Sequence, residues 1–261
     1  MPTEFFQYLV NRVRPDFYNF VEPIEPLYEP WGRSLYFFSF QLVIGTERAM
    51  LIDTGYAMGN VPALVKKYTD LPVTLLITHN HLDHVRAAHH FDDVYMSEYE
   101  LLPDEKASFN WKNVKDGDVF DLGGIVLEAV LVPGHTRGSM CLIDKKNKVL
   151  YTGDAINKLP YIFSPHGTSL EEYHESLLRV KEMTDKDYKM WCGHTWHAYP
   201  YEVLLDSITA CEEVLAGKTE KDWGYRSPFE SAGPIVPDVF EHICGSTRLI
   251  YSRKRLRRDQ V

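Results

Sequence analysis

Three histidines and one aspartate fall within six consecutive residues of this 261-residue chain, His79-Asn80-His81-Leu82-Asp83-His84. His and Asp are ligand types that suit zinc, manganese and iron. In an extended segment, residues i and i+2 can project to the same side, so His79 and His81 could chelate one ion. Asp83 and His84 would then face a neighbouring position. Because solvated loops favour Ser, Gly, Asn and Lys over His, the cluster indicates a metal site rather than a polar surface loop.

The cluster directly follows a short, β-branched apolar run at residues 73–77, which predicts a buried strand. Upstream, two β-rich runs within residues 35–55 flank the segment 45–48, a pattern typical of a hairpin that ends near Asp53. Open sheets usually carry their chemistry at the ends of strands. The sequence therefore predicts a functional loop at a sheet edge.

A metal site built only from this cluster would be incomplete, and three later motifs offer further ligands. They are Pro133-Gly134-His135, Gly153-Asp154 and Gly193-His194, and each follows a β-rich run. A lone Gly-His or Gly-Asp pair usually marks a turn, but the order of the three motifs after the first cluster strengthens the prediction. We expect strands over residues 119–122, 125–132, 140–143, 148–152 and 188–192, and helices over about 170–182 and 201–216.

The composition is that of a folded globular protein, with 44% hydrophobic and 25% charged residues. The formal charge of −9 argues against a nucleic-acid partner. Four widely spaced cysteines without a CxxC pair fit a reducing compartment. No signal peptide or membrane-spanning stretch is evident, so we expect a cytoplasmic protein that has no membrane partner.

Five motifs taken together resemble the metallo-β-lactamase-fold hydrolases: Asp53 in LIDTG, HNHLDH at 79–84, PGHTRGS at 133–139, TGDA at 152–155 and CGH at 192–194. The resemblance spans residues 53–194 and implies an α/β fold, an αββα sandwich with a two-metal site at one edge. We therefore expect residues 1–261 to form a single domain of this type, with a helical and basic C-terminal extension over about 200–261.

The resemblance also assigns a role to each motif residue. It implies that His79, His81 and His135 bind one metal, that Asp83, His84 and His194 bind a second, and that Asp154 bridges them. Asp53 would not bind metal itself but would orient the ligand loop through hydrogen bonds. Two Zn²⁺ ions are the expected cofactors, with iron or manganese as alternatives.

A two-metal site implies a hydrolase in which a metal-bridging hydroxide attacks a carbonyl carbon, with Asp83 and Asp154 handling the proton. We expect a small ester, thioester or lactone as substrate, with thioesters of the glyoxalase II kind first and lactones second. A β-lactam is less favoured, because β-lactamases of this fold usually lack the equivalent of His84 and often have Cys in place of Asp154.

Three other interpretations stay open. Persulfide dioxygenases resemble the same motifs but use one iron, held by the equivalents of His79, His135 and Asp154. A phosphodiesterase of the same fold is the second alternative, and a metal-retaining binding protein without catalysis is the third. The partner in every enzymatic case is a small molecule, and an oligomer is possible.

Candidate substrate residues are Asn157, Tyr161 and His166, which lie near the metal motifs. The aromatic segments 107–111 and 161–163 could either shape a binding loop or pack against the sandwich. The C-terminal segment 248–258 holds six basic residues. It could be a solvated tail or could bind an anionic arm of the substrate, such as a glutathione carboxylate or a coenzyme A phosphate.

Overall fold

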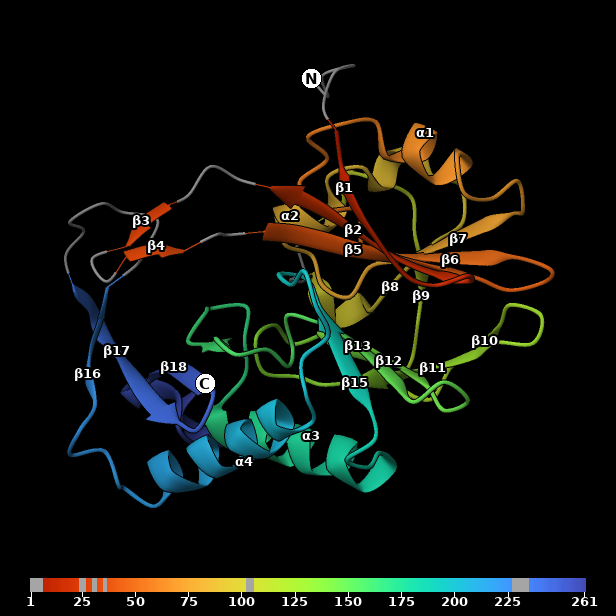
Figure 1. Cartoon of the computed structure of the whole chain (residues 1–261). Helices are drawn as coiled ribbons and strands as arrows, with labels where there is room; N and C mark the ends of the chain where they lie inside the picture. Colours follow the sequence, from red (N-terminus) through yellow and green to blue (C-terminus); the bar gives the residue numbers. More distant parts are fainter. Residues whose placement is uncertain (1–6, 24–26, 30–31, 35–36, 102–105, 227–234) are drawn as a thin grey trace.

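Two stacked β-sheets with helices on their outer faces make up the core of the molecule (Figure 1). The computed structural model describes residues 7–23, 27–29, 32–34, 37–101, 106–226 and 235–261. The αββα sandwich expected from the sequence is confirmed. Among the described residues, no helix combines the length and the apolar character that crossing a membrane requires.

The first sheet contains the predicted hairpin and the strand before the histidine cluster. Its strand order is β1-β2-β5-β6-β7-β8-β9, with β6, β7, β8 and β9 parallel to one another. The strands are β1 (Leu9–Arg14), β2 (Phe17–Pro23), β5 (Phe37–Ile44), β6 (Ala49–Ile52), β7 (Val73–Leu76), β8 (Val94–Met96) and β9 (Lys112–Asn113). A separate small hairpin joins β3 (Leu27–Glu29) to β4 (Gly32–Ser34).

The second sheet has the order β10-β11-β12-β13-β15. Its first four strands form an antiparallel meander, and β15 joins β13 in parallel. The strands are β10 (Val119–Asp121), β11 (Val126–Leu131), β12 (Met140–Asp144), β13 (Val149–Gly153) and β15 (Lys189–Cys192). All five strands predicted for this part of the chain are therefore present, and no end differs from its predicted position by more than one residue.

Apolar side chains from both sheets fill the space between them. Met50 and Leu76 of the first sheet meet Leu142, Tyr151 and Trp191 of the second, and all five are buried. Because these strands are covered on both faces, they appear in the sequence as nearly continuous apolar runs. This core fixes the relative position of the two sheets.

Helices cover the outer faces. Helix α1 (Val61–Lys66) packs on the first sheet, and α3 (Leu170–Met183) and α4 (Glu202–Leu215) pack on the second. Ser169 and Glu172 form the predicted capping box of α3. The remaining helical segments are short: α2 (Leu82–Val85) and 3₁₀ turns at Ala88–His90, Glu98–Glu100, Arg253–Arg255 and Arg258–Gln260.

The expected helical extension after residue 200 is wrong beyond α4. The chain instead forms a four-stranded sheet from β14 (Tyr161–Ile162), β16 (Trp223–Arg226), β17 (Ile235–Cys244) and β18 (Thr247–Ser252). Strand β18 is almost entirely buried, and a tight turn at Gly245, with φ of +54°, closes the hairpin with β17. In the hairpin, the backbone N–H and C=O groups of this apolar run form hydrogen bonds, and one face of the hairpin packs against α4.

Candidate metal centre

Each predicted ligand lies at or just beyond a strand end. The segment 79–84 follows β7 and enters α2, and His135 lies in the loop between β11 and β12. Asp154 follows β13 and His194 follows β15, and these two strands are parallel neighbours. Parallel strands end at the same edge of a sheet, so the topology brings distant residues to one place.

His79, His81 and His135 form the first group. The Nδ1 atom of His81 lies 3.1 Å from Nε2 of His79 and 3.0 Å from Nε2 of His135. Burial lowers the pKa of all three imidazoles, that of His81 to about 4, and neighbouring histidines add to the effect at His79 and His81. Neutral imidazoles with converging nitrogens are the form in which His binds a metal.

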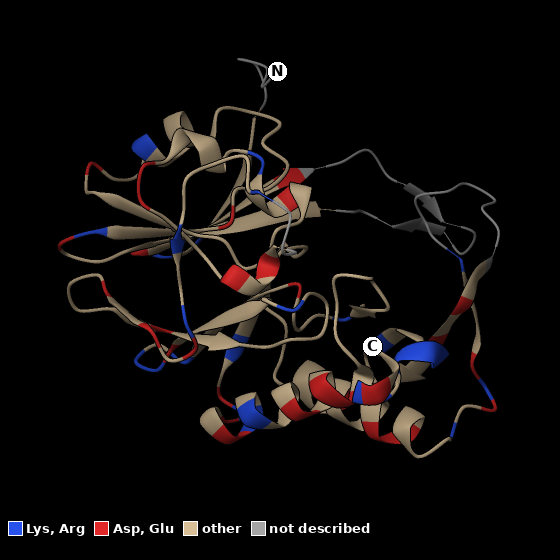
Figure 2. Ribbon diagram, turned by 180° about the vertical axis from the view of Figure 1, so that it is seen from behind, with Lys and Arg blue, Asp and Glu red and all other residues tan. Residues whose placement is uncertain are grey.

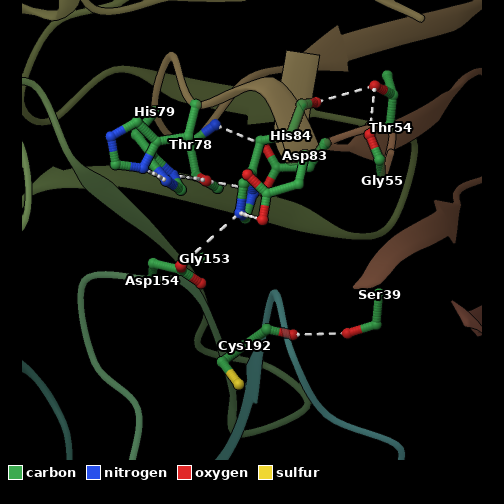
Figure 3. Close-up of polar contacts among 12 residues, drawn as sticks. Ser39, Thr54, Gly55, Thr78, His79, Asp83, His84, Gly153, Asp154 and Cys192 are labelled. Carbon is green, nitrogen blue, oxygen red and sulfur yellow. Dashed lines mark hydrogen bonds and ion pairs between the residues drawn. The ribbon is translucent and has the colours of Figure 1, made fainter. Parts of the chain in front are cut away.

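Asp83, His84 and His194 form a second group beside the first. The Oδ2 atom of Asp83 lies 3.8 Å from Nε2 of His84 and 3.5 Å from Nε2 of His194. Asp154 stands between the groups: its Oδ2 lies 3.0 Å from His194 Nε2, 3.8 Å from His84 Nε2 and 3.9 Å from His135 Nε2. Figure 3 shows Asp154 reaching from the second sheet toward His84 and Asp83. The structure thus brings all seven predicted ligands together.

The residues present fit bound metal ions. His84 Nε2 and Asp154 Oδ1 are buried and have no hydrogen-bond partner, although an unpaired polar atom in the interior is costly. Both atoms face Gly193, where a Cβ atom would lie 2.4 Å from Cε1 of His84 and 2.9 Å from Asp154 Oδ1. Imidazole nitrogens and carboxylate oxygens are the donors that zinc accepts. The open atoms and the glycine therefore leave room for a cation.

The second group has an electrostatic field that favours positive charge. Burial opposes the protonation of His84, yet the carboxylates of Asp53, Asp83 and Asp154 raise its pKa to about 10. Burial likewise opposes ionisation of Asp154, but His194 and His84 hold the pKa of Asp154 well below its ordinary value. A metal ion would take the place of the proton that these carboxylates attract.

Asp53 lies behind the ligands, where the sequence predicted a residue that orients the loop. Its Oδ1 accepts the Thr78 N–H at 2.7 Å, and its Oδ2 accepts the Thr78 hydroxyl at 2.8 Å and lies 2.7 Å from His84 Nδ1. Asp53 has a φ of +63°, a conformation that Asp tolerates better than most residues.

Backbone carbonyls contact the outer nitrogens of two other ligands. Tyr161 O lies 3.0 Å from His135 Nδ1, and Phe37 O lies 2.8 Å from His194 Nδ1. These contacts hold the imidazoles with their other nitrogen toward the centre.

Glu100 is a buried residue that sequence reasoning missed. Its carboxylate accepts the backbone N–H of Asn80 at 2.6 Å and the hydroxyl of Thr136 at 2.5 Å, and the Gly138 N–H also donates to it. Burial raises the pKa of Glu100 to about 7. Asn80 lies between two ligands and Thr136 follows a third, so Glu100 ties two ligand loops together. No spacing rule links Glu100 to the motifs, and only the fold reveals it.

The three candidate substrate residues have different surroundings. Asn157 is buried, and its side chain hydrogen-bonds within its own turn. Its Oδ1 accepts the Leu159 N–H at 2.7 Å. The Tyr161 hydroxyl accepts a hydrogen bond from that of Tyr225 at 3.1 Å. His166 alone of the three lines a cavity of about 330 Å³ beside the centre. The cavity wall also contains Asn80, His81, Glu100, Lys106 and Thr136.

The two aromatic segments pack against the protein. Phe109 and Trp111 are half-buried on the core of the first sheet. Tyr161 and Phe163 pack with Tyr225 next to the C-terminal sheet. Packing therefore accounts for both segments.

Comparison with known proteins places this centre in a family. The profile described as "Metallo-beta-lactamase superfamily" matches residues 37–190, which include all the predicted ligands except His194. Among solved structures, a metallo-beta-lactamase from Pontibacter korlensis superposes with a TM-score of 0.64 at 18% identity, over 79% of this chain and 99% of that chain. At this identity the likeness concerns the fold.

Curated relatives share more of the sequence. A probable polyketide biosynthesis zinc-dependent hydrolase, BaeB, from Bacillus velezensis is 27% identical over 69% of this chain and 80% of its own length. The acyl-coenzyme A thioesterase MBLAC2 from Gallus gallus is 26% identical over 65% of this chain and 75% of its own length. The first name describes a zinc-dependent hydrolase, and the second describes a thioesterase that acts on acyl-coenzyme A.

Proposed function

The chain belongs to the metallo-β-lactamase superfamily and is a metal-dependent hydrolase, and we propose that its substrate is a small thioester, cleaved at a centre of two zinc ions. The observation that carries the proposal is the junction of the seven-residue centre with the 330 Å³ cavity at His81. The named wall residues of the cavity are mostly polar. That lining suits a polar thiol carrier better than a purely apolar substrate.

Bound zinc would supply Lewis acidity and a water of lowered pKa. The protein would orient the ions through its seven ligands and hold a proton on a carboxylate. Asp83 is better placed than Asp154 to hold this proton, because its side chain is more accessible to water. The Asp83 side chain is 23% exposed and that of Asp154 only 10%. The carboxylate of Asp83 would accept the proton of the attacking water and return it to the departing thiolate. A thiol has a pKa of about 8.5, so its anion leaves without a strong acid.

Lactones remain the second candidate within the same chemistry. In lactonases of this fold, a Tyr commonly stands three residues after the bridging Asp, where this chain has Asn157. Because Asn157 is engaged in its own turn, it offers no equivalent hydroxyl to a substrate. This difference favours the thioester.

A substrate panel tests the proposal. Zinc-loaded protein is assayed against acyl-CoA, acyl-glutathione, an acyl-homoserine lactone and a β-lactam. We expect the highest kcat/KM with one of the two thioesters. Preference for the lactone or the β-lactam would overturn the proposal, and oxygen consumption with a persulfide would identify the dioxygenase alternative.

A further inference from the structure

The basic C-terminal segment is mostly bound by acidic partners. Arg248 pairs with Glu241, Lys254 with Asp238, Arg257 with Glu171 and Arg258 with Glu175. Figure 2 shows the chain end beside the acidic helices. Arg253 stacks on the ring of Phe240, with Cζ 3.7 Å from the ring centre. These five residues are therefore engaged with the protein itself and do not form a free anion-binding tail.

Arg255 differs from its neighbours. Its Nη2 donates to the carbonyl of Gly167 at 2.8 Å, while its Nε is buried without a hydrogen-bond partner. Burial lowers its pKa and the nearby positive charge of Arg137 lowers it further. Glu172 opposes this effect, but its carboxylate accepts hydrogen bonds from Ser169 in the capping box. Arg255 thus lies beside a like charge without an ion pair of its own.

Arg137 contacts the same loop. Its backbone N–H donates to the carbonyl of His166 at 2.9 Å. Arg137 is exposed, and its positive charge lies close enough to Arg255 to lower the pKa of that residue. Arg137 and Arg255 therefore each hydrogen-bond to a carbonyl of the pair His166–Gly167.

This loop borders the cavity beside the metal centre. His166 lines the cavity together with His81, and Lys106 adds a further positive charge to the wall. The Glu100 carboxylate also lines it, but hydrogen bonds from Asn80 and Thr136 engage both of its oxygens. Lys106 on the cavity wall, and Arg137 and Arg255 beside the loop of His166, thus place three positive charges close to the cavity in a chain whose formal charge is −9.

We infer that Arg137 and Arg255, with Lys106 on the cavity wall, form a subsite for the phosphate of the thiol carrier. This inference rests on the proposed thioester hydrolysis and names the carrier class. Guanidinium groups bind phosphate through paired N–H donors, and a phosphate would offset the repulsion between the two arginines. Coenzyme A and the phosphopantetheine arm of a carrier protein share this chemistry, whereas glutathione offers only carboxylates.

The test compares substrates with and without the phosphate. The double variant Arg137→Gln/Arg255→Gln is assayed with an acyl-CoA and with the same acyl group on N-acetylcysteamine. One lost charge-assisted hydrogen bond corresponds to roughly a tenfold change. We expect KM for acyl-CoA to rise at least about tenfold with kcat nearly unchanged, and KM for the N-acetylcysteamine thioester to stay the same. The control Lys254→Gln/Arg258→Gln removes the same charge from paired positions and should leave both KM values unchanged.

Further substrates distinguish the sources of the phosphate. A larger effect with an acylated carrier protein than with acyl-CoA identifies the carrier, and the reverse identifies free coenzyme A. An equal rise in KM for acyl-glutathione would overturn phosphate recognition. An unchanged KM for both phosphate-bearing substrates would also overturn it and leave the proposed function intact.

Direct binding separates failure of the inference from failure of the proposed function. Desulfo-CoA binding to zinc-loaded protein is measured by calorimetry. Weaker binding to the double variant supports the subsite even if no thioester is hydrolysed. Equal affinity for both proteins overturns the subsite even if N-acetylcysteamine thioesters are cleaved.

Discussion

The Glu100 carboxylate accepts the backbone N–H of Asn80 at 2.6 Å, which places a buried acid directly behind the loop that holds His79 and His81. Through Thr136, the same carboxylate reaches the loop of His135. One side chain outside the motifs therefore connects the two loops that carry the ligands of the first group.

Replacing Glu100 should weaken metal binding. Glu100→Gln keeps the shape but turns one acceptor into a donor, so one ligand loop loses its contact. Loss of a residue that orients ligands typically costs about 10- to 100-fold in metal affinity. Competition with a chelator measures the zinc affinity. Glu98→Gln, in the same 3₁₀ turn but in an exposed contact with Asn113, is the matched control. Unchanged zinc affinity in Glu100→Gln would contradict this role.

Asp154→Ala should lower kcat more than the loss of any single histidine. Asp154 is the residue whose oxygen faces both groups of ligands, at 3.0 Å from His194 and 3.9 Å from His135. Without it the two ions that we propose would no longer share a ligand, and a displacement of about 1 Å can cost roughly 100-fold in rate. Zinc content and kcat are measured together, with His81→Ala for comparison.

An Asp154→Ala protein that kept two zinc ions and a nearly normal kcat would exclude the bridging role. A single ion held by His79, His81 and His135 would then be the better description of the centre.

Much of the fold and centre could be predicted from the sequence, because the signals are local. The run before His79 is apolar and short, and each later ligand follows a glycine at a strand end. The central strands are covered on both faces, so they consist of nearly uninterrupted apolar residues. Strands β7 and β12 are therefore easy to predict.

The parts that could not be predicted depend on tertiary contacts. Strand β2 contains the buried polar residues Asn19 and Glu22, whose partners lie far away in sequence. Strands β16 and β17 contain polar and exposed positions, such as Trp223, and so lack a clear apolar run. Glu100 contacts mainly backbone N–H groups, which carry no sequence signal.

The stability of the protein should fall as pH rises through neutrality because of Glu22. Its oxygens accept the N–H groups of Tyr56 and Met58 at 2.6 and 2.7 Å, and burial raises its pKa from 4.5 to about 7. Because the pKa of Glu22 is higher in the folded state than in the unfolded state, protonation of Glu22 stabilises the folded protein. This stabilisation is complete below pH 4.5 and is lost as pH rises through about 7. The loss amounts to about 3 kcal/mol of the free energy of unfolding.

Urea unfolding at pH 5 and pH 8, with saturating zinc, measures this contribution. The free energy of unfolding should differ less between the two pH values in Glu22→Gln than in the wild type, by about 3 kcal/mol. Glu47→Gln, at an exposed position in the β5–β6 turn, should behave like the wild type. An equal pH dependence in Glu22→Gln would contradict the role of the buried carboxyl.

We expect the seven converging residues to hold zinc for thioester hydrolysis. The most direct measurement removes metal with a chelator and then follows bound zinc and hydrolysis of an acyl-N-acetylcysteamine thioester during a zinc titration. We predict a negligible rate without metal and a rate that rises to its maximum at about two zinc ions per chain. Hydrolysis of the thioester at the full rate by metal-free protein would contradict the account.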